Sequence, residues 1–412
     1  MHSLFRLSIA PLLSIAILML GSGYYTTFIS MRLYQDGQGA FIIGLVQGAY
    51  YAGFLIGALK IEALMHRIRH IRAYAFFTCI CTAIVLLQGL YIHPYAWVIE
   101  RFIMGLCIAS LYVVIESWLL IIAPESSKGT LLSFYMIALY CSQALSQFLV
   151  DFLNPRSMTP FIVTAIFSSL SMMPATFTYT HIPEQIGAER ATFLSILKKS
   201  PFGAWGCIVA GMILSSLYSF VPTFAERTGL SVSYAMSLMI AGGFLLQWPL
   251  GYLSDIFDRR KILILVSILT VLPCAGIMLL MGKAKLILGL IFLLGGFTFT
   301  LYPLSITHVT DRHKTHDLTS ITAVMLFAYS TGSVVGPLVA PFFINMSDTM
   351  GLFIYIGIMA GILSVVGLVS AALIRPVPKA EQGDFVPLPG QSTLSYELDP
   401  RSSASEDEAK KN

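Results

Sequence analysis

The sequence predicts an all-α membrane protein with twelve transmembrane helices, arranged as two six-helix bundles related by pseudo-two-fold symmetry. Hydrophobic residues make up 56% of the 412 residues and charged residues only 11%, whereas a soluble domain carries about 25% charged residues. The mean hydropathy is +0.79. Apolar segments recur along the whole chain, and short patterns of the first half return in the second. These features exclude an ordinary soluble domain.

Windows of about 20 apolar residues, the length of a helix that crosses a bilayer, identify the spans. The first window follows Arg6 and resembles a signal peptide, but the apolar run is long and lacks a small-x-small cleavage site. We therefore expect an uncleaved first helix. The twelve windows lie at residues 8–31, 41–63, 73–92, 96–122, 130–153, 158–180, 202–223, 232–254, 262–281, 286–309, 319–343 and 350–374.

The distribution of basic residues predicts that both termini are cytoplasmic. Cytoplasmic loops carry an excess of Lys and Arg. The N-terminus and the loops after even-numbered spans hold most of them, at Arg6, Arg67, Arg69, Arg72, Lys128, Arg190, Lys198, Lys199, Arg259, Arg260, Lys261, Arg312 and Lys314. The opposite loops hold fewer, at Arg32, Arg156, Arg227, Lys283 and Lys285. The net charge of +4 follows this topology and gives no sign of a nucleic-acid surface.

A charged stretch in the middle of the chain divides the spans six and six. We expect an N-terminal bundle at residues 1–180, a cytoplasmic linker at 181–201 and a C-terminal bundle at 202–374. The remaining residues, 375–412, are polar, rich in Pro at first and acidic later. That composition predicts a disordered cytoplasmic tail.

Two short matches indicate an internal duplication. Residues 104–112 and 294–302 share Gly at the second position and Leu-Tyr at the end, at an offset of 190 residues. Residues 57–59 (Gly-Ala-Leu) and 251–253 (Gly-Tyr-Leu) match at an offset of 194. Duplicated six-helix halves are typical of secondary transporters, with the solute site between the halves near the bilayer midplane.

The fourth span carries ionisable residues inside an apolar run. At 100° per residue, one stripe of this helix holds Arg101, Gly105, Ala109, Tyr112 and Glu116. A charged side chain in hydrocarbon costs about 2.5–3.5 kcal/mol or more. We therefore expect the stripe to face protein or water, as in a solute path.

Each of the two charges in this stripe has a functional and a structural interpretation. Removal from water favours the protonated form of a carboxyl group, so Glu116 is a candidate proton-coupling residue; alternatively it pairs with the basic residues 67–72 as a latch. The planar guanidinium of Arg101 suits an anionic solute. Alternatively, Arg101 pairs with Asp151 or Asp36 and holds the outer end together.

Two motifs resemble those of the major facilitator superfamily. The fourth-span signature R-x-x-x-G-x-x-x-A is matched by Arg101, Gly105 and Ala109. The loop signature G-x-L-x-D-x-x-x-R-[RK] is matched after the eighth span by Gly251, Leu253, Asp255, Arg259 and Arg260. After the second span Ile61 stands in place of its Asp. The run Glu116-Ser117-Trp118-Leu119, with the Phe385-Val-Pro-Leu-Pro segment of the tail, resembles a bacterial branch of uncharacterised permeases, and this resemblance implies a location in the bacterial inner membrane.

The resemblance implies roles for two groups of residues. The first would form an inner gate: Asp255, Arg259 and Arg260, with Arg67 and Arg69 after the second span. The alternative is ordinary positive-inside anchoring. The second group would line the solute cavity, because spans one, four, seven and ten line it in this superfamily and spans five and eight contribute: Arg101, Tyr112, Tyr24, Gln143, Gln147, Gln247 and Tyr302. Hydrogen bonding between helices explains the uncharged members equally well.

No motif for bond-making chemistry is present. H-E-x-x-H, Walker A and kinase-like glycine loops are absent from the sequence, so we expect neither an enzyme nor an ATP-driven pump. The six cysteines lie in apolar segments without a C-x-x-C pair, which predicts reduced packing residues, no disulfide framework and no metal site. We expect no cofactor.

The leading hypothesis is a secondary active transporter that works as a monomer by alternating access. A small solute and a coupling proton are its expected partners, besides the lipid bilayer. Metabolite uptake is slightly preferred, because Arg101 suits an anion and span five lacks the Gly-Pro motif of proton/drug antiporters. Drug efflux is the alternative of the same class. A transport-inactive membrane receptor or scaffold is the alternative of another class.

Overall fold

The structure is a computed structural model that describes most of the chain. The described residues are 2–68, 70–122, 127–176, 200–312 and 318–373, with 377–378, 382–383, 385–388 and 390 near the C-terminus. Within these ranges the secondary structure is helical, and no strand occurs among them.

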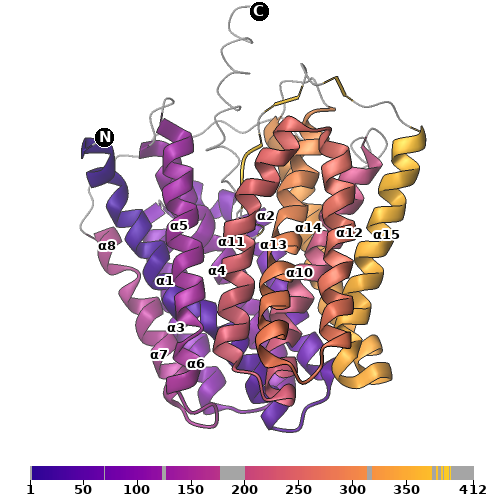
Figure 1. The fold of residues 1–412 in the computed structure, drawn as a ribbon. Helices are drawn as coiled ribbons and strands as arrows, with labels where there is room; N and C mark the ends of the chain where they lie inside the picture. The colour runs from indigo at the N-terminus through magenta and orange to yellow at the C-terminus, as the bar shows by residue number, and fades with distance from the viewer. Residues whose placement is uncertain are drawn as a thin grey trace, which may run out of the picture. The chain divides into compact units, whose positions relative to one another are not determined.

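Twelve helices of the described residues are long and apolar enough to cross a membrane, which confirms the predicted number of spans. Helices satisfy every backbone group internally, as a bilayer requires. The helices of the first half, two of whose spans consist of two helices each, are α1 (His2–Gln35), α2 (Ala40–Ile68), α3 (His70–Leu90), α4 (Pro94–Ile122), α5 (Lys128–Ser146), α6 (Leu149–Phe152), α7 (Thr159–Leu170) and α8 (Met173–Thr176). In the second half they are α10 (Pro201–Thr228), α11 (Val232–Ile256), α12 (Arg259–Leu279), α13 (Ala284–Thr310), α14 (Leu318–Ser347), the 3₁₀ turn η2 (Asp348–Met350) and α15 (Gly351–Leu373) (Figure 1).

Two of the spans are interrupted, which the hydropathy windows do not predict. The fifth span consists of α5 and α6, and the sixth of α7 and α8. At the first break, the amides of Gln147 and Phe148 bond the carbonyls three residues earlier, Ala144 and Leu145, at 3.3 and 3.2 Å. Such i−3 bonds tighten the helix locally.

Local sequence sets several helix ends in the second half. Gly229, at a φ of +70°, terminates α10 in the left-handed conformation that Gly adopts without strain. Ser231 caps α11 by accepting a hydrogen bond from the amide of Tyr234 at 3.3 Å. Asp258 caps α12 by accepting from the amide of Arg260 at 3.0 Å. The loop signature therefore also contains the start of a helix.

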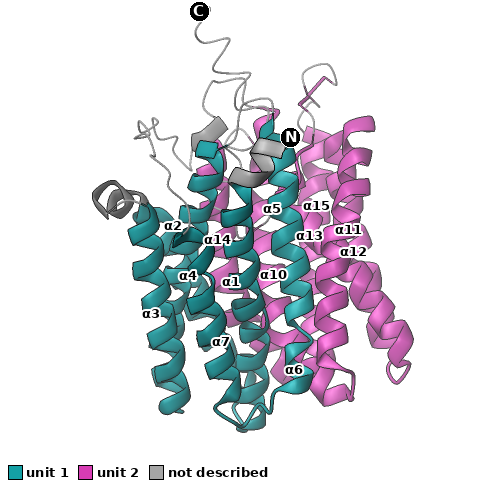
Figure 2. Cartoon of the chain, turned by 90° about the vertical axis from the view of Figure 1, so that its left-hand side faces the viewer, with its two compact units in different colours: residues 1–187, 391–412 teal, residues 188–390 magenta. Residues whose placement is uncertain are grey.

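The chain divides into two compact units. Unit 1 consists of residues 1–187 and 391–412, and unit 2 of residues 188–390 (Figure 2). The division falls inside the predicted 181–201 linker, of which residues 181–199 lie outside the described part of the chain.

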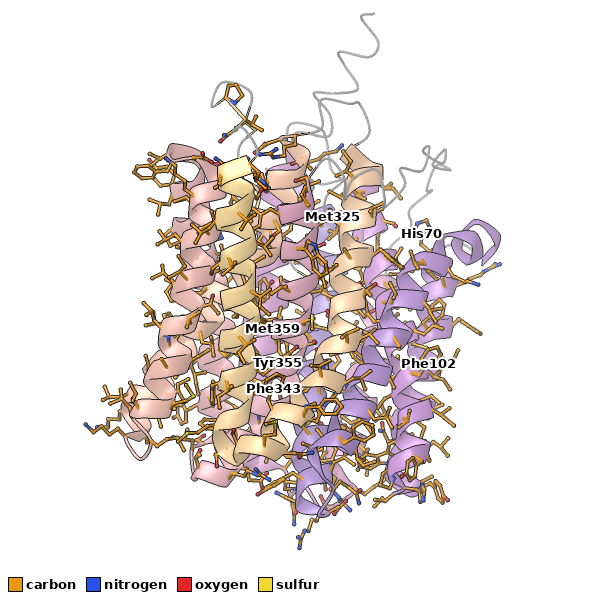
Figure 3. All side chains as sticks on the ribbon, turned by 90° about the vertical axis from the view of Figure 1, so that its right-hand side faces the viewer. His70, Phe102, Met325, Phe343, Tyr355 and Met359 are labelled. Atoms are coloured by element: carbon orange, nitrogen blue, oxygen red, sulfur yellow. The ribbon has the colours of Figure 1, made fainter. Side chains whose placement is uncertain are left out.

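Equivalent spans pack against each other inside each unit. In unit 1 the pairs are α2 with α4, α1 with α5, and α3 with α7. In unit 2 the same positions pair as α11 with α13, α10 with α14, and α12 with α15. The last two long helices of unit 2 also contact each other: the rings of Phe343 on α14 and Tyr355 on α15 pack with their centroids 5.5 Å apart (Figure 3). The repeated pairing supports the duplication inferred from the sequence.

Glycines at matching positions bring the paired helices together. A Cβ on Gly105 of α4 would collide with the carbonyl oxygen of Tyr50 on α2, and one on Gly295 of α13 with that of Met239 on α11. The partner helices also carry glycines without space for a Cβ, Gly53 in α2 and Gly242 in α11. The 190-residue offset of the sequence match is therefore the offset between two equivalent helix crossings.

The C-terminal segment departs from the predicted disordered tail. The described residues 382–383, 385–388 and 390, here called the tail strap, belong to unit 2, and Val386 and Leu388 are buried. Its described backbone groups hydrogen-bond to side chains of the transmembrane bundle. The prediction was wrong for the strap because a polar average composition hid a short apolar run, Phe385 to Leu388. Residues 391–412 lie outside the described part.

Candidate functional site

Arg101 lies at the meeting point of three helices of unit 1. The side chain comes from α4, and the residue is 1% exposed. Its Nη2 donates to Oε1 of Gln47 on α2 at 2.7 Å and to Oγ1 of Thr26 on α1 at 3.3 Å. Its Cζ lies 4.3 Å from the ring centroid of Tyr50 and 5.8 Å from that of Tyr25. Neutral oxygens and aromatic faces therefore surround the cation.

Gln47 is held so that its oxygen faces the guanidinium. Its Nε2 donates to Oγ of Ser30 at 2.7 Å and to the carbonyl oxygen of Thr26 at 2.9 Å. Because both donors of the amide are directed toward α1, the oxygen is left for Arg101. Sequence reasoning missed Gln47; its signal is a lone amide in an otherwise apolar second span.

Arg101 has no carboxylate partner among the described residues. The proposed partner Asp36 instead pairs with Arg32 at 2.7 Å, one helical turn away. No ion pair joins Arg101 to Asp151 among the described residues, and the Nε of Arg101 is buried without a hydrogen bond there. The outer-end clamp weighed for Arg101 is thus not what these residues form. A buried charge without an opposite charge is costly.

Glu116 lies buried at the other end of the stripe. Its Oε1 accepts a 2.6 Å hydrogen bond from the hydroxyl of Tyr135 on α5, and both residues are fully buried. Between the charges, the hydroxyl of Tyr112 lies 3.1 Å from the sulfur of Met19 on α1, and its ring meets that of Phe54 edge-on at 5.9 Å. The stripe therefore faces protein, as its charges require.

Two uncharged candidates join helices within unit 1. The hydroxyl of Tyr24 donates to the carbonyl of Pro160 at 2.6 Å and accepts from Thr164 at 2.8 Å. Gln147 accepts from Thr27 at 2.7 Å and donates to the carbonyl of Gly23 at 3.0 Å. Their polar groups are occupied, which favours the interhelical interpretation for both.

Gln143 differs from these two. It is 5% exposed, and its side-chain amide has no hydrogen bond to any described residue. The backbone carbonyl of Gln143 accepts from Oγ of Ser146 at 2.7 Å, one turn before the break in span five. Its side chain is therefore not used to join helices among the described residues, unlike that of Gln147.

In unit 2, the two predicted lining residues lie near the tail strap. Gln247 is fully buried, its Nε2 donates to the carbonyl of Leu388 at 3.3 Å, and its Oε1 has no partner among the described residues. The ring of Tyr302 packs on that of Tyr329 at a centroid distance of 4.5 Å.

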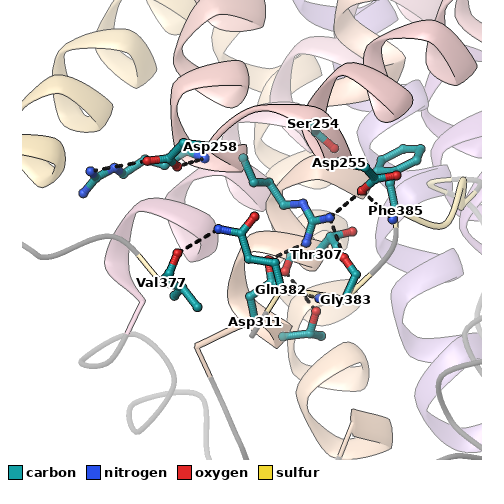
Figure 4. A network of polar contacts seen from close by, with 12 residues as sticks. Ser254, Asp255, Asp258, Thr307, Asp311, Val377, Gln382, Gly383 and Phe385 are labelled. Carbon is teal, nitrogen blue, oxygen red and sulfur yellow. Dashed lines mark hydrogen bonds and ion pairs between the residues drawn. The ribbon is translucent and has the colours of Figure 1, made fainter. Parts of the chain in front are cut away.

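The loop signature forms an ion network centred on Arg259 (Figure 4). The Arg259 guanidinium, 2% exposed, donates to Oδ1 of Asp255 at 2.7 Å and forms an ion pair with Asp311 at the end of α13. Arg260 extends toward Asp258 at 3.9 Å. Plain anchoring at the membrane surface does not describe Arg259, because it is buried between two carboxylates. The side chains of Arg67 and Arg69 lie outside the described part of the chain.

Asp311 was not predicted, although the sequence carries a signal for it. A carboxylate at the C-terminal end of a helix opposes the helix dipole, so its presence after the tenth span indicates a nearby cation. That cation is Arg259.

Comparison with known proteins decides the family. The sequence model of the Major Facilitator Superfamily matches residues 12–282 and 231–403. The chain belongs to the Major Facilitator Superfamily. Two relatives in this superfamily are named as uncharacterised MFS-type transporters. YcaD of Escherichia coli is 29% identical over 346 residues, covering 82% of this chain and 89% of the relative. A protein of Enterobacter sp. (strain 638) is 28% identical over 375 residues, covering 90% and 97%.

Solved major facilitator structures share the fold. The nucleoside transporter NupG superposes with a TM-score of 0.69 at 14% identity, covering 91% of this chain and all of that one. A bacterial homologue of the human lysosomal transporter Spinster, inward-facing and unoccupied, gives 0.67 at 14% identity, covering 98% and 94%. At these identities the likeness concerns the fold alone. As a major facilitator, the chain is a multi-pass integral membrane transporter of a small molecule.

Proposed function

We propose that this major facilitator takes up a small anionic or zwitterionic metabolite by alternating access, driven by protons. The observation that carries the proposal is Arg101, a buried cation whose neighbours among the described residues are neutral. An anionic group of a solute would supply the missing opposite charge. A planar guanidinium can bind a carboxylate or phosphate with two parallel hydrogen bonds.

Glu116 is the proposed proton carrier. It is fully buried, and the hydroxyl of Tyr135 directs one hydrogen bond at its carboxyl group. Arg101 and Glu116 share α4, at a separation of about 22 Å along the axis. A movement of this one helix in the transport cycle would change the surroundings of both groups. That common helix is the proposed basis for coupling solute to proton.

The test is a thermal-shift screen of the purified protein against anionic, zwitterionic and neutral metabolites at two pH values. A ligand stabilises the folded state that it binds. Nucleosides serve as the neutral arm, because NupG shares the fold. We expect an anionic or zwitterionic ligand, whose shift disappears in Arg101→Gln. A ligand that stabilises Arg101→Gln as strongly as the parent contradicts the role of Arg101.

A second variant, Gln47→Glu, sharpens this test. It places a carboxylate 2.7 Å from the guanidinium, where the amide oxygen now lies. The variant neutralises a buried charge but loses the two hydrogen bonds that Nε2 of Gln47 donates to Ser30 and Thr26, so we expect an unfolding temperature close to that of the parent. It should also bind the anionic ligand more weakly, because the internal carboxylate competes for Arg101. Tighter anion binding would contradict the proposal.

Drug efflux makes a different prediction for the same chain. A strain without the gene would become more sensitive to several unrelated drugs, whereas loss of a metabolite importer would leave drug sensitivity unchanged. A susceptibility panel on the deletion strain therefore separates the two directions of transport.

A further inference from the structure

The tail strap lies on the loop signature of unit 2. Its residue Gly383 accepts a 2.7 Å hydrogen bond from Nη2 of Arg259 and donates its amide to Oδ1 of Asp311 at 3.1 Å. The amide of Phe385 donates to Oδ1 of Asp255 at 2.8 Å. All three contacts are drawn in Figure 4. The signature side chains thus bind one another and the strap backbone at the same time.

Apolar contacts continue beyond this ion network. The ring of Phe385 occupies the position where a Cβ on Gly251 would lie, so the first glycine of the signature gives the strap its seat. Val386 is 8% exposed and Leu388 is 3% exposed. A polar tail with a buried apolar centre is typical of a docked segment.

The far end of the strap reaches the predicted lining residues of unit 2. The amide of Gln247 donates to the carbonyl of Leu388 at 3.3 Å. At Gly390, a Cβ would lie 2.7 Å from the hydroxyl of Tyr329, whose ring packs on Tyr302. The strap backbone therefore contacts Gln247, a predicted lining residue, and lies against Tyr329, which packs on the predicted lining residue Tyr302.

We propose that the tail strap is an intrachain lid on unit 2, which must leave its seat before Gln247 and its neighbours can be reached from the side of the α11–α12 loop. The strap is held by Asp255, Arg259 and Asp311, so the loop signature would control the lid as well as its own ion pairs. The proposal depends on the transport role of the family and on neither the proton nor the solute proposed above. When the lid is seated in most molecules, the apparent affinity for a ligand beneath it is reduced in proportion to the fraction of molecules whose lid is open.

Cysteine labelling tests the lid without requiring transport. In a background without the native cysteines, Gln247→Cys serves as the reporter in inside-out vesicles, with a membrane-impermeant maleimide as the probe. This reporter loses one 3.3 Å bond to the strap and retains the contacts of Gly383 and Phe385. Ending the chain after Lys379 should accelerate labelling at least about tenfold, the factor expected if the open form is a tenth or less of the molecules.

Two controls identify the strap as the cause. Ending the chain after Gly390 removes residues 391–412 but keeps the strap, so labelling should stay at the parent rate. A synthetic peptide of residues 380–391 should slow labelling of the shorter chain again, whereas a scrambled peptide should not. Equal labelling of the parent and of the chain that ends at Lys379 would overturn the lid.

A point variant covers the case in which the short chain does not fold. Gly251→Ala removes the seat of Phe385 and leaves the chain at full length. With Val386→Cys as the reporter, it should expose the strap to maleimide about tenfold faster. Cysteine at the exposed position Lys261 is the reference, and its labelling should not change. Unchanged labelling at Val386→Cys would contradict docking itself. The proposed solute role is tested separately by Arg101→Gln, so a failure of that test would leave the labelling result for the lid unchanged.

Discussion

At the scale of single residues, the two units hold their buried arginines differently. In unit 1, Arg101 is surrounded by Gln47, Thr26 and tyrosine rings. In unit 2, by contrast, Arg259 is neutralised by two carboxylates. A cation held by two carboxylates suits a structural lock, whereas a buried cation without a carboxylate among the described residues suits a site that receives a charged ligand.

The proton role of Glu116 predicts a loss of coupling without a loss of exchange. Glu116→Gln retains the size of the side chain and cannot release a proton. A gradient of one pH unit supplies about 1.4 kcal/mol per proton, enough for about tenfold accumulation. Proteoliposomes with the variant should accumulate no solute against its gradient but should still exchange it. Tyr135→Phe removes the 2.6 Å hydrogen bond while keeping the carboxyl group, so accumulation should persist. Full accumulation by Glu116→Gln contradicts the role.

The sequence predicts the charged members of the site better than their partners. Arg101 and Glu116 are recognisable because a charge inside an apolar span must avoid lipid. Gln47 contacts Arg101 from another helix, and Asp311 contacts Arg259 from another helix. A single sequence does not show which positions of two helices lie side by side. For the same reason, the sequence could not distinguish Gln147, which joins α5 to α1, from Gln143, whose amide forms no bond to the described residues.

At the scale of helices, close backbone contact at glycine defines the architecture of both units. Gly105 of α4 and Gly295 of α13 occupy equivalent crossings, each against a backbone carbonyl of its neighbour. The number of spans could be predicted because length and hydropathy determine it. The breaks within spans five and six could not, because hydropathy averaged over a span-length window does not resolve an interruption of two residues.

These crossings predict unequal effects of the same substitution at different glycines. Gly105→Ala places a methyl group against the carbonyl of Tyr50, and such overpacking costs about 1–3 kcal/mol or more. Gly361 in α15 has no atom within 4 Å of its Cβ position. Gly361→Ala should be neutral or stabilise the protein by up to about 1 kcal/mol, because Ala favours helix. Thermal unfolding in detergent measures both variants. Equal melting temperatures for the two would contradict the close crossing.

At the scale of the whole molecule, the tail connects to the bundle through the family's own signature. Asp255 ends α11, Arg259 begins α12 and Asp311 follows α13, so three helix ends meet at one guanidinium. The strap adds a fourth chain segment to that point through Gly383. Composition predicted a disordered tail, because an average over many polar residues does not resolve the few that dock.

The division into units predicts that the covalent link between them can be cut. Each helix pair described above lies inside one unit, and the division at residues 187 and 188 falls where no described contact would be disturbed. A protease site inserted there should be cleaved in the purified protein, and both fragments should keep their helical circular dichroism. The uncut protein with the same insertion is the control, and ligand-induced thermal shift is the second readout. If one fragment loses its helical circular dichroism or its unfolding transition after cleavage, its fold depends on the intact chain, and packing within that unit alone does not sustain it.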